Sequence, residues 1–329
     1  MNRNNYDVKQ WKISEQELKG GRLIAGYMGI VMMLAGMITL LPLFILIFYP
    51  EEAGQACCFV IPGVCSTLAG YLLSLMLLGS TNFFVHLLLI RGRFKAVFFH
   101  CETRLTIFLL ALFVPVLAVL LFMGMYGGIS ESFRIALFQA VSALTTAGFQ
   151  TVDSFADWTP PMIFLMIVLM LIGGGTGSTA GGLKIYRVYV MLKEIWWNLA
   201  QSIYPNRVVF TEQINRGGKK ENVTDKEKNQ INAFVFFYLL IFAIGTFIFC
   251  CFGYSVQDSM FEFASALSTV GLSVGITAYD ASPVIHWTAS AGMLLGRLEI
   301  YVVFIAATRM AADGREFFLQ HKKAKERKL

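Results

Sequence analysis

Apolar runs long enough to cross a lipid bilayer recur along this chain and constrain its fold more than any other feature. Residues 23–48, 105–126, 231–252 and 284–307 each form such a run, and residues 57–90 form a longer one. A helix needs about 20 apolar residues to cross a hydrocarbon core about 30 Å thick. The composition agrees, because 56% of the 329 residues are hydrophobic and 15% are charged. We therefore expect an all-α polytopic membrane protein.

The basic residues gather in four places, and all four fall on one side of the resulting topology. They lie between Lys9 and Arg22, between Arg91 and Lys95, between Lys193 and Lys228, and between Arg315 and Lys328. Cytoplasmic loops carry an excess of Lys and Arg. We therefore expect a multi-pass protein of the cell inner membrane, surrounded by lipid, with both termini in the cytoplasm. Nucleic-acid binding is excluded because it would need a soluble basic face.

One apolar segment occurs twice, between longer runs of membrane-spanning length. Phe138 to Val152 reads FQAVSALTTAGFQTV, and Phe261 to Gly275 reads FEFASALSTVGLSVG. Such a repeat predicts two re-entrant pore loops, each a half-helix followed by a curled strand. The alternative is ordinary helix-packing sequence. The shared residues are Phe138/Phe261, Ser142/Ser265, Ala143/Ala266, Leu144/Leu267, Thr146/Thr269 and Gly148/Gly271.

The end of each copy has the composition of an ion filter. Glycine permits the positive φ that a curled backbone needs, and backbone carbonyls can replace the hydration shell of a cation. Neither filter segment holds a carboxylate, which favours carbonyl coordination of a large, weakly hydrated cation. The predicted filter residues are Thr145, Thr146, Ala147, Gly148 and Phe149 in the first copy, and Ser268, Thr269, Val270, Gly271 and Leu272 in the second.

A glycine-rich run interrupts the span between the two copies. The apolar stretch Met162–Ile172 before it covers only about 16 Å as a helix, so the run begins near the middle of the membrane. Irregular backbone at that depth is tolerated inside protein or along a water-filled cavity. We expect an intramembrane gate loop beneath the filter. The predicted gate residues are Gly173, Gly174, Gly175, Thr176, Gly177, Ser178, Thr179, Ala180, Gly181, Gly182, Lys184 and Arg297.

Two other interpretations of this run are weaker. A phosphate-binding loop needs lysine after its last glycine, but Leu183 stands there and no strand precedes the run. A close helix crossing through small residues is the second alternative, but so many glycines disfavour a helix.

Arg297 lies near the middle of the last apolar run, where a charge needs a polar partner. The carbonyls of the glycine run are the natural candidates, and a structural anchor to Glu262 or Glu299 is the alternative. Lys184 and Arg187 follow the glycine run, and the common behaviour of such residues is to reach toward the inner membrane surface.

An enzyme is not expected. The histidines (His86, His100, His286 and His321) are scattered, and no carboxylate lies with them at one depth. The six cysteines show no metal-ligand spacing. We expect no cofactor and no structural metal in this chain.

Several of these segments resemble the Trk/Ktr/HKT superfamily of potassium transporters, and within it the bacterial Trk-type membrane subunit. The resemblance is carried by the two filter segments and by four further motifs: GGGTGSTAGGLKIYR from Gly173, YPNRVV from Tyr204, GRLEIY from Gly296 and NFFVHLLLIRGR from Asn82.

The resemblance implies four helix–pore loop–helix repeats around one pore, with K⁺ as the transported ion. Gly148 and Gly271 match the third and fourth filter glycines. Residues 173–182 match the gate, and Arg297 matches an arginine that bears on it. The resemblance also implies a homodimer and a cytosolic, nucleotide-binding regulatory partner, a TrkA-like ring of RCK (KTN) domains.

This sequence departs from that pattern because only two filter segments are recognisable, so the first repeat and most of the second are predicted to be missing. K⁺ uptake would then need two chains to complete one four-loop pore. The alternative is a non-conducting truncated or assembly subunit of a full-length transporter. The predicted parts are a cytoplasmic N-terminus (1–22), N-terminal helices and a loop (23–103), a third-repeat-like unit (104–203), a cytoplasmic loop (204–230), a fourth-repeat-like unit (231–312) and a basic tail (313–329).

Overall fold

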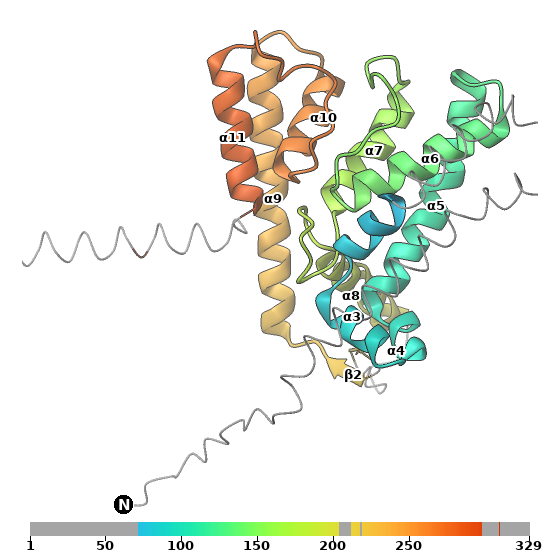
Figure 1. Cartoon of the computed structure of the whole chain (residues 1–329). Coiled ribbons are helices and arrows are strands. Elements are labelled where there is room, and N and C mark those ends of the chain that lie inside the picture. The colour runs from blue at the N-terminus through green and yellow to red at the C-terminus, as the bar shows by residue number, and fades with distance from the viewer. Residues whose placement is uncertain (1–71, 204–211, 218, 298–308, 310–329) are drawn as a thin grey trace, which may run out of the picture. The chain divides into compact units, whose positions relative to one another are not determined.

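The computed structural model describes residues 72–203, 212–217, 219–297 and 309. These residues are mostly helical, which confirms the predicted fold class (Figure 1). The elements are α3 (Phe83–Ile90), α4 (Phe94–Phe98), α5 (Cys101–Gly124), α6 (Ile129–Leu144), α7 (Pro160–Ile172), α8 (Ile185–Ile203), β1 (Gln213–Arg216), β2 (Lys219–Asn222), α9 (Asp225–Cys251), α10 (Val256–Leu267) and α11 (Pro283–Arg297).

Some expectations fall outside the described residues. They are the span 23–48, the first part of the run 57–90, the YPNRVV motif at 204–209, the end of the last run with Glu299, and the basic tail.

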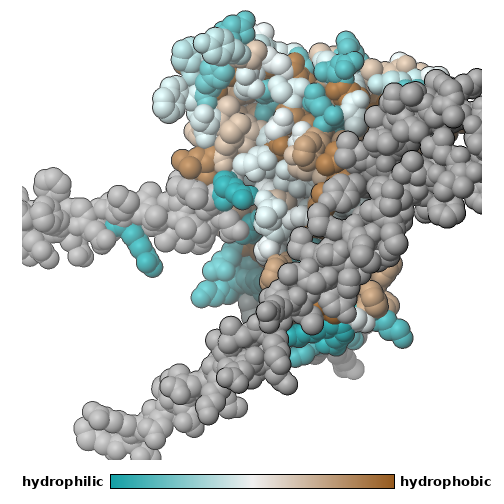
Figure 2. Space-filling view, viewed as in Figure 1, coloured by the Kyte–Doolittle hydropathy of each residue, from teal (hydrophilic) through white to brown (hydrophobic). Residues whose placement is uncertain are grey.

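Two described helices are long and apolar enough to cross a membrane. They are α5 and α9, at the places where the spans 105–126 and 231–252 were predicted. Both expose large apolar side chains, including Phe108 on α5 and Phe236 and Phe247 on α9. Figure 2 shows such hydrophobic residues on the surface of the described part. An apolar surface of this kind suits lipid, in which a helix satisfies all its backbone hydrogen bonds internally.

The long run 57–90 is not one straight helix in its described part. A helical segment at Leu72–Ser80 and α3 meet at an angle of 109°. Asn82 restarts the helix, because its side chain accepts a hydrogen bond from the Phe84 amide. The corner where they meet, residues 79–82, comprises the last two residues of the first helix and the two that follow, and it contacts the glycine-rich run, as shown below.

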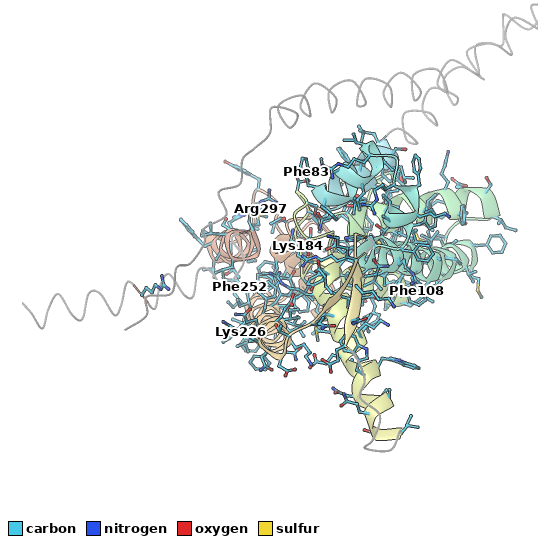
Figure 3. The ribbon with its side chains drawn as sticks, turned by 90° about the horizontal axis from the view of Figure 1, so that it is seen from below. Phe83, Phe108, Lys184, Lys226, Phe252 and Arg297 are labelled. Carbon is cyan, nitrogen blue, oxygen red and sulfur yellow. The ribbon has the colours of Figure 1, made fainter. Side chains whose placement is uncertain are left out.

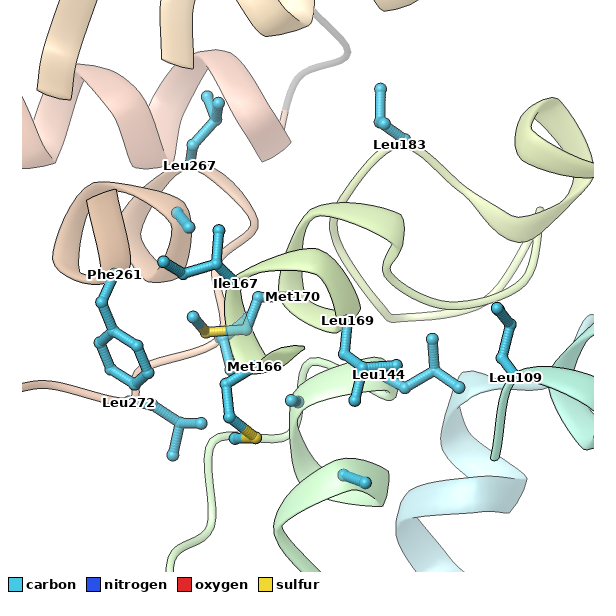
Figure 4. Close-up of a cluster of buried hydrophobic side chains, with 14 of the residues drawn as sticks. Leu109, Leu144, Met166, Ile167, Leu169, Met170, Leu183, Phe261, Leu267 and Leu272 are labelled. Carbon is cyan, nitrogen blue, oxygen red and sulfur yellow. The ribbon is translucent and has the colours of Figure 1, made fainter. Parts of the chain in front are cut away.

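The two predicted pore helices are α6 and α10. α6 packs against α5 and α7, and α10 packs against α7, α9 and α11. In Figure 4 the α7 side chains Met166 and Met170 lie between Phe261 of the second copy and Leu144 of the first. All four side chains are buried. The short helix α7 is therefore the apolar layer that joins the two copies.

A small β-hairpin formed by β1 and β2 was not predicted. It lies in the segment 204–230, which we expected to be a loop. Its strands are antiparallel, with Gln213 opposite Asn222 and Arg216 opposite Lys219. The Gly217-Gly218 pair between the strands is a recognised signal for a tight hairpin turn.

Candidate functional site

The two filter segments follow the same backbone path. α6 ends at Leu144 and α10 at Leu267. Two residues later, Thr146 and Thr269 both have φ of 53°, and Gly148 and Gly271 have φ of 74° and 97°. A positive φ is uncommon for a residue other than glycine. The repeat in the sequence is therefore also a repeat in an unusual backbone conformation.

The hydrogen bonds that produce this curl are also repeated. The Ala147 amide donates to Ser142 O at 3.1 Å, and the Val270 amide donates to Ser265 O at 2.9 Å. The carbonyl oxygens of Thr146, Ala147 and Gly148 in the first copy, and of Thr269, Val270 and Gly271 in the second, accept no hydrogen bond among the described residues, whereas Phe149 O accepts one from Ser142 Oγ. The oxygens without such a donor are available to a ligand.

The two filter segments lie against each other. A Cβ atom added at Gly148 would come within 2.0 Å of Val270 O, so only glycine fits there. A Cβ atom added at Gly271 would meet nothing within 4 Å among the described residues. The first filter glycine is thus required by a neighbour as well as by its φ, whereas the second is required by its φ alone.

Hydroxyl side chains of the pore helices form hydrogen bonds with the backbone of both filter segments. Ser142 Oγ donates to Phe149 O at 2.5 Å, while Ser265 Oγ accepts from the Gly271 amide at 3.1 Å. Three residues further along the chain, Ser268 Oγ shares a hydrogen bond of 2.7 Å with the buried Tyr238 hydroxyl of α9. The equivalent Thr145 Oγ1 donates to Val141 O of its own helix at 2.7 Å.

The chain beyond each filter is held by the same position of its pore helix. In the first copy, Gln139 donates from Nε2 to Thr151 Oγ1 at 3.2 Å. In the second copy, Glu262 stands at that position and accepts hydrogen bonds from three residues. These donors are Ser273 Oγ, the Val274 amide, and both the amide and the hydroxyl of Thr277.

The glycine run forms a closed loop and not a helix crossing. α7 ends at Ile172, and the next residue, Gly173, has φ of 69°. The two ends of the loop are hydrogen-bonded to each other, from the Leu183 amide to Leu171 O at 3.0 Å and from the Ile185 amide to Gly174 O at 2.9 Å. The loop therefore has a narrow neck, and its tip spans residues 175–181.

The tip of this loop contacts both filter segments. The Gly181 amide donates to Thr146 Oγ1 of the first segment at 2.8 Å. A Cβ atom added at Gly181 would lie 2.1 Å from Ser268 O of the second segment. The close packing explains why glycine stands at this position.

Two basic side chains bind carbonyls of the loop. Arg297, at the end of α11, donates from Nη1 to Thr179 O at 2.6 Å, so the expected contact with the glycine run is present (Figure 3). The alternative anchor, Glu262, binds the segment beyond the second filter instead. Lys184 donates from Nζ to Ala180 O. The Lys184 ammonium group thus contacts the predicted gate loop, and its reach toward the membrane surface stays a prediction.

Arg187 contacts the neighbouring helix α9. Its guanidinium group lies over the Phe234 ring, 3.9 Å from the ring centre. A cation over an aromatic face is stabilised by the ring quadrupole. Arg187 therefore joins α8 to α9.

Two contributors to this site were not predicted. Glu102 of α5 accepts a hydrogen bond from the Thr176 amide at 3.3 Å, and Ser80 O accepts one from the Gly175 amide at 2.8 Å. A single acid in the first turn of a helix is common, because it complements the helix dipole. Glu102 therefore carries no special signal in the sequence. By contrast, the difference between Gln139 and Glu262 can be seen in the sequence, because the two residues occupy equivalent positions of the two copies.

Comparisons with known proteins find similar cation transport proteins. The model of the family described as "TrkH: Cation transport protein" matches residues 67–317. The Trk system potassium uptake protein TrkH of Salmonella typhimurium is 30% identical over 238 residues, which are 71% of this chain and 48% of that protein. An uncharacterized cation transporter of Methanocaldococcus jannaschii is 36% identical over 173 residues, which are 52% of this chain and 35% of that protein.

A solved structure has the same fold over most of the described chain. The crystal structure of the potassium transporter TrkH from Vibrio parahaemolyticus matches with a TM-score of 0.63 and 27% identity. The match covers 73% of this chain and 52% of the other. The chain thus spans about half the length, or less, of the relatives that it matches.

Proposed function

Since this chain belongs to the TrkH family of cation transport proteins, we propose that it takes part in K⁺ uptake across the cell inner membrane. The family confirms the prediction of a transport protein and not an enzyme. The relatives named as potassium uptake proteins support K⁺ as the ion.

The observation that carries this proposal is the pair of adjacent, equally curled filter segments. Thr146 and Thr269 share one φ value, and the segments touch at Gly148 and Val270. Carbonyl oxygens without hydrogen-bond donors can replace the water around a dehydrated K⁺ ion. We assign the ion path to residues 145–149 and 268–272 on this basis.

The gate follows from the glycine loop. Its tip lies against both filter segments through Gly181, where its backbone would obstruct an ion leaving them. Arg297 and Lys184 hold two of its carbonyls. Release of these two side chains would remove part of what holds the tip, which a gate that opens requires.

Two filter segments form part of a path, and a second copy of the chain would supply two more. We therefore propose a homodimer in the inner membrane, with both termini in the cytoplasm. The basic cytoplasmic segments would face a TrkA-like nucleotide-binding ring, in keeping with the Trk systems named among the relatives.

Rubidium uptake by liposomes that contain the purified full chain tests the proposal. We expect uptake above that of empty vesicles, competed by K⁺ more strongly than by Na⁺. Gly148→Ser and Gly271→Ser should weaken this discrimination, because a side chain at a positive φ distorts the carbonyl path. Lys226→Gln, at an exposed position on α9, is the control that should match the parent chain.

Absence of uptake by verified, inserted protein would contradict conduction by this chain alone. Co-purification with a four-repeat relative would then support the alternative, an assembly subunit of a full-length transporter.

A further inference from the structure

We infer that Glu102 is a positioning residue of the glycine loop. It holds the first half of the loop tip at Thr176, whereas Arg297 holds the second half at Thr179. This inference rests on the proposed role of the loop as the gate. It adds an acidic residue to the basic Arg297 and Lys184 at that gate, from a helix far from Arg297 in the sequence.

The Glu102 carboxyl group is buried against the loop. The residue is 4% exposed. Its Oε1 atom accepts from the Thr176 amide at 3.3 Å, a contact between residues 74 positions apart. Its Oε2 atom is buried and has no hydrogen-bond partner among the described residues. A Cβ atom added at Gly175 would lie 3.1 Å from that oxygen.

The corner at residues 79–82 forms the other wall of this site. The Gly175 amide donates to Ser80 O at 2.8 Å, and Thr179 Oγ1 donates to Gly79 O at 3.1 Å. A Cβ atom added at Gly175 would lie 3.0 Å from Ser80 O. The start of the tip is therefore enclosed between the corner and the first residues of α5.

Glu102 and Arg297 hold the tip through different chemistry. An ionised carboxylate only accepts hydrogen bonds, and a guanidinium group only donates them. Glu102 takes a backbone amide at Thr176, and Arg297 takes a backbone carbonyl at Thr179. Each therefore binds a group of the loop that the other cannot.

A simple helix-dipole role does not account for the position of Glu102. An acid in the first turn of a helix gains from the dipole while it stays in water, and burial of a carboxyl group is costly unless it is paired. Glu102 forms no ion pair within the described ranges. The adjacent His100 does not neutralise it, since burial, and to a lesser extent Arg216, lower the pKa of that imidazole to about 4.

The experiment measures access to the tip by thiol labelling of the purified full chain in detergent. Ser178→Cys is the probe, with a polyethylene glycol maleimide as reagent, and the chain without the probe gives the background from its six cysteines. Glu102→Ala and the isosteric Glu102→Gln are compared on this probe. Glu131→Gln is the matched control, because Glu131 is also a first-turn acid but is exposed.

We expect Glu102→Ala to raise the labelling rate about tenfold, the scale of one lost buried hydrogen bond. Glu102→Gln should raise it less, and Glu131→Gln should leave it unchanged. Arg297→Ala should also raise it, and the effects of Arg297→Ala and Glu102→Ala should exceed additivity in the double variant.

An unchanged labelling rate in folded Glu102→Ala and Glu102→Gln protein would overturn the inference. If Glu102→Ala does not fold, Glu102→Gln alone decides in the same way. Rubidium uptake is measured on the same samples. Faster labelling without uptake in any sample, the parent chain included, would support the contact and contradict the proposed transport function.

Discussion

The two filter segments have the same shape but are supported to different degrees. The first depends on Gln139, which makes one hydrogen bond to the chain beyond the filter. The second depends on Glu262, which accepts bonds from three residues there. The second is also tied to a spanning helix through Tyr238. The backbone path is therefore set by the shared Ser-Ala-Leu-Thr/Ser pattern, while stiffness is set by residues that differ.

The packing of the first filter segment depends on the position of the second. Gly148 packs against Val270 O, whereas Gly271 meets nothing nearby among the described residues. The more heavily braced copy thus provides a wall for the less braced one. Paired substitutions at equivalent positions can test this dependence, because each copy serves as the control for the other.

Alanine at the two filter glycines should give the largest difference in stability between the two copies. Gly148→Ala adds a Cβ atom 2.0 Å from Val270 O at a φ of 74°, so overpacking and backbone strain together should cost about 3 kcal/mol. Gly271→Ala meets only the strain of its φ, about 1 kcal/mol. Thermal unfolding in detergent should therefore show a larger fall in Tm for Gly148→Ala.

Rubidium uptake should follow the same order, with K⁺ selectivity lost in Gly148→Ala and reduced in Gly271→Ala. Equal losses of stability in the two variants would contradict the unequal packing of the two glycines.

Truncation of the pore-helix braces should also affect the two copies unequally. Glu262→Ala removes the acceptor for donors on Ser273, Val274 and Thr277, and bonds to a charged group contribute about 1.5–3 kcal/mol. Gln139→Ala removes one neutral bond, about 1 kcal/mol. The fall in Tm and the loss of K⁺ over Na⁺ discrimination should both be greater for Glu262→Ala.

Placing glutamine, the residue of the first copy, at position 262 of the second copy sharpens this test. Glu262→Gln replaces one acceptor oxygen by an NH₂ group, which only donates. The amide oxygen can keep the three bonds that Oε1 accepts, but the NH₂ group then faces the Val274 amide, so we expect Glu262→Gln to lose part of what Glu262→Ala loses. If Glu262→Gln behaved like the parent chain, the carboxylate would not be the source of the stiffness.

The sequence predicted the parts of this fold that depend on local pattern. The apolar runs located α5 and α9, and glycine after Ile172 located the end of α7 because it allows a positive φ. The contact of Arg297 with the glycine run followed from the need of an intramembrane charge for a polar partner. Each of these depends on a few neighbouring residues.

The missed parts depend on which distant surfaces meet. The Thr179 side chain binds Gly79 O across 100 residues, and Glu102 binds the loop across 74. Neither Gly79 nor Glu102 has an unusual neighbourhood in the sequence. The bend of 109° before α3 was also hidden, because Gly79 indicates flexibility without giving a direction.

The smallest expected difference lies at the serines behind the filters, Ser142 and Ser265. Ser142→Ala frees the Phe149 carbonyl, while Ser265→Ala leaves the Gly271 amide without its acceptor. Each neutral bond contributes about 1 kcal/mol, so the two falls in Tm should be similar. The effects on selectivity should differ, because a freed carbonyl can turn toward the ion path and an amide cannot coordinate a cation. Competition of rubidium uptake by Na⁺ should therefore increase in Ser142→Ala more than in Ser265→Ala, and the opposite order would show that the Phe149 carbonyl lies away from the path.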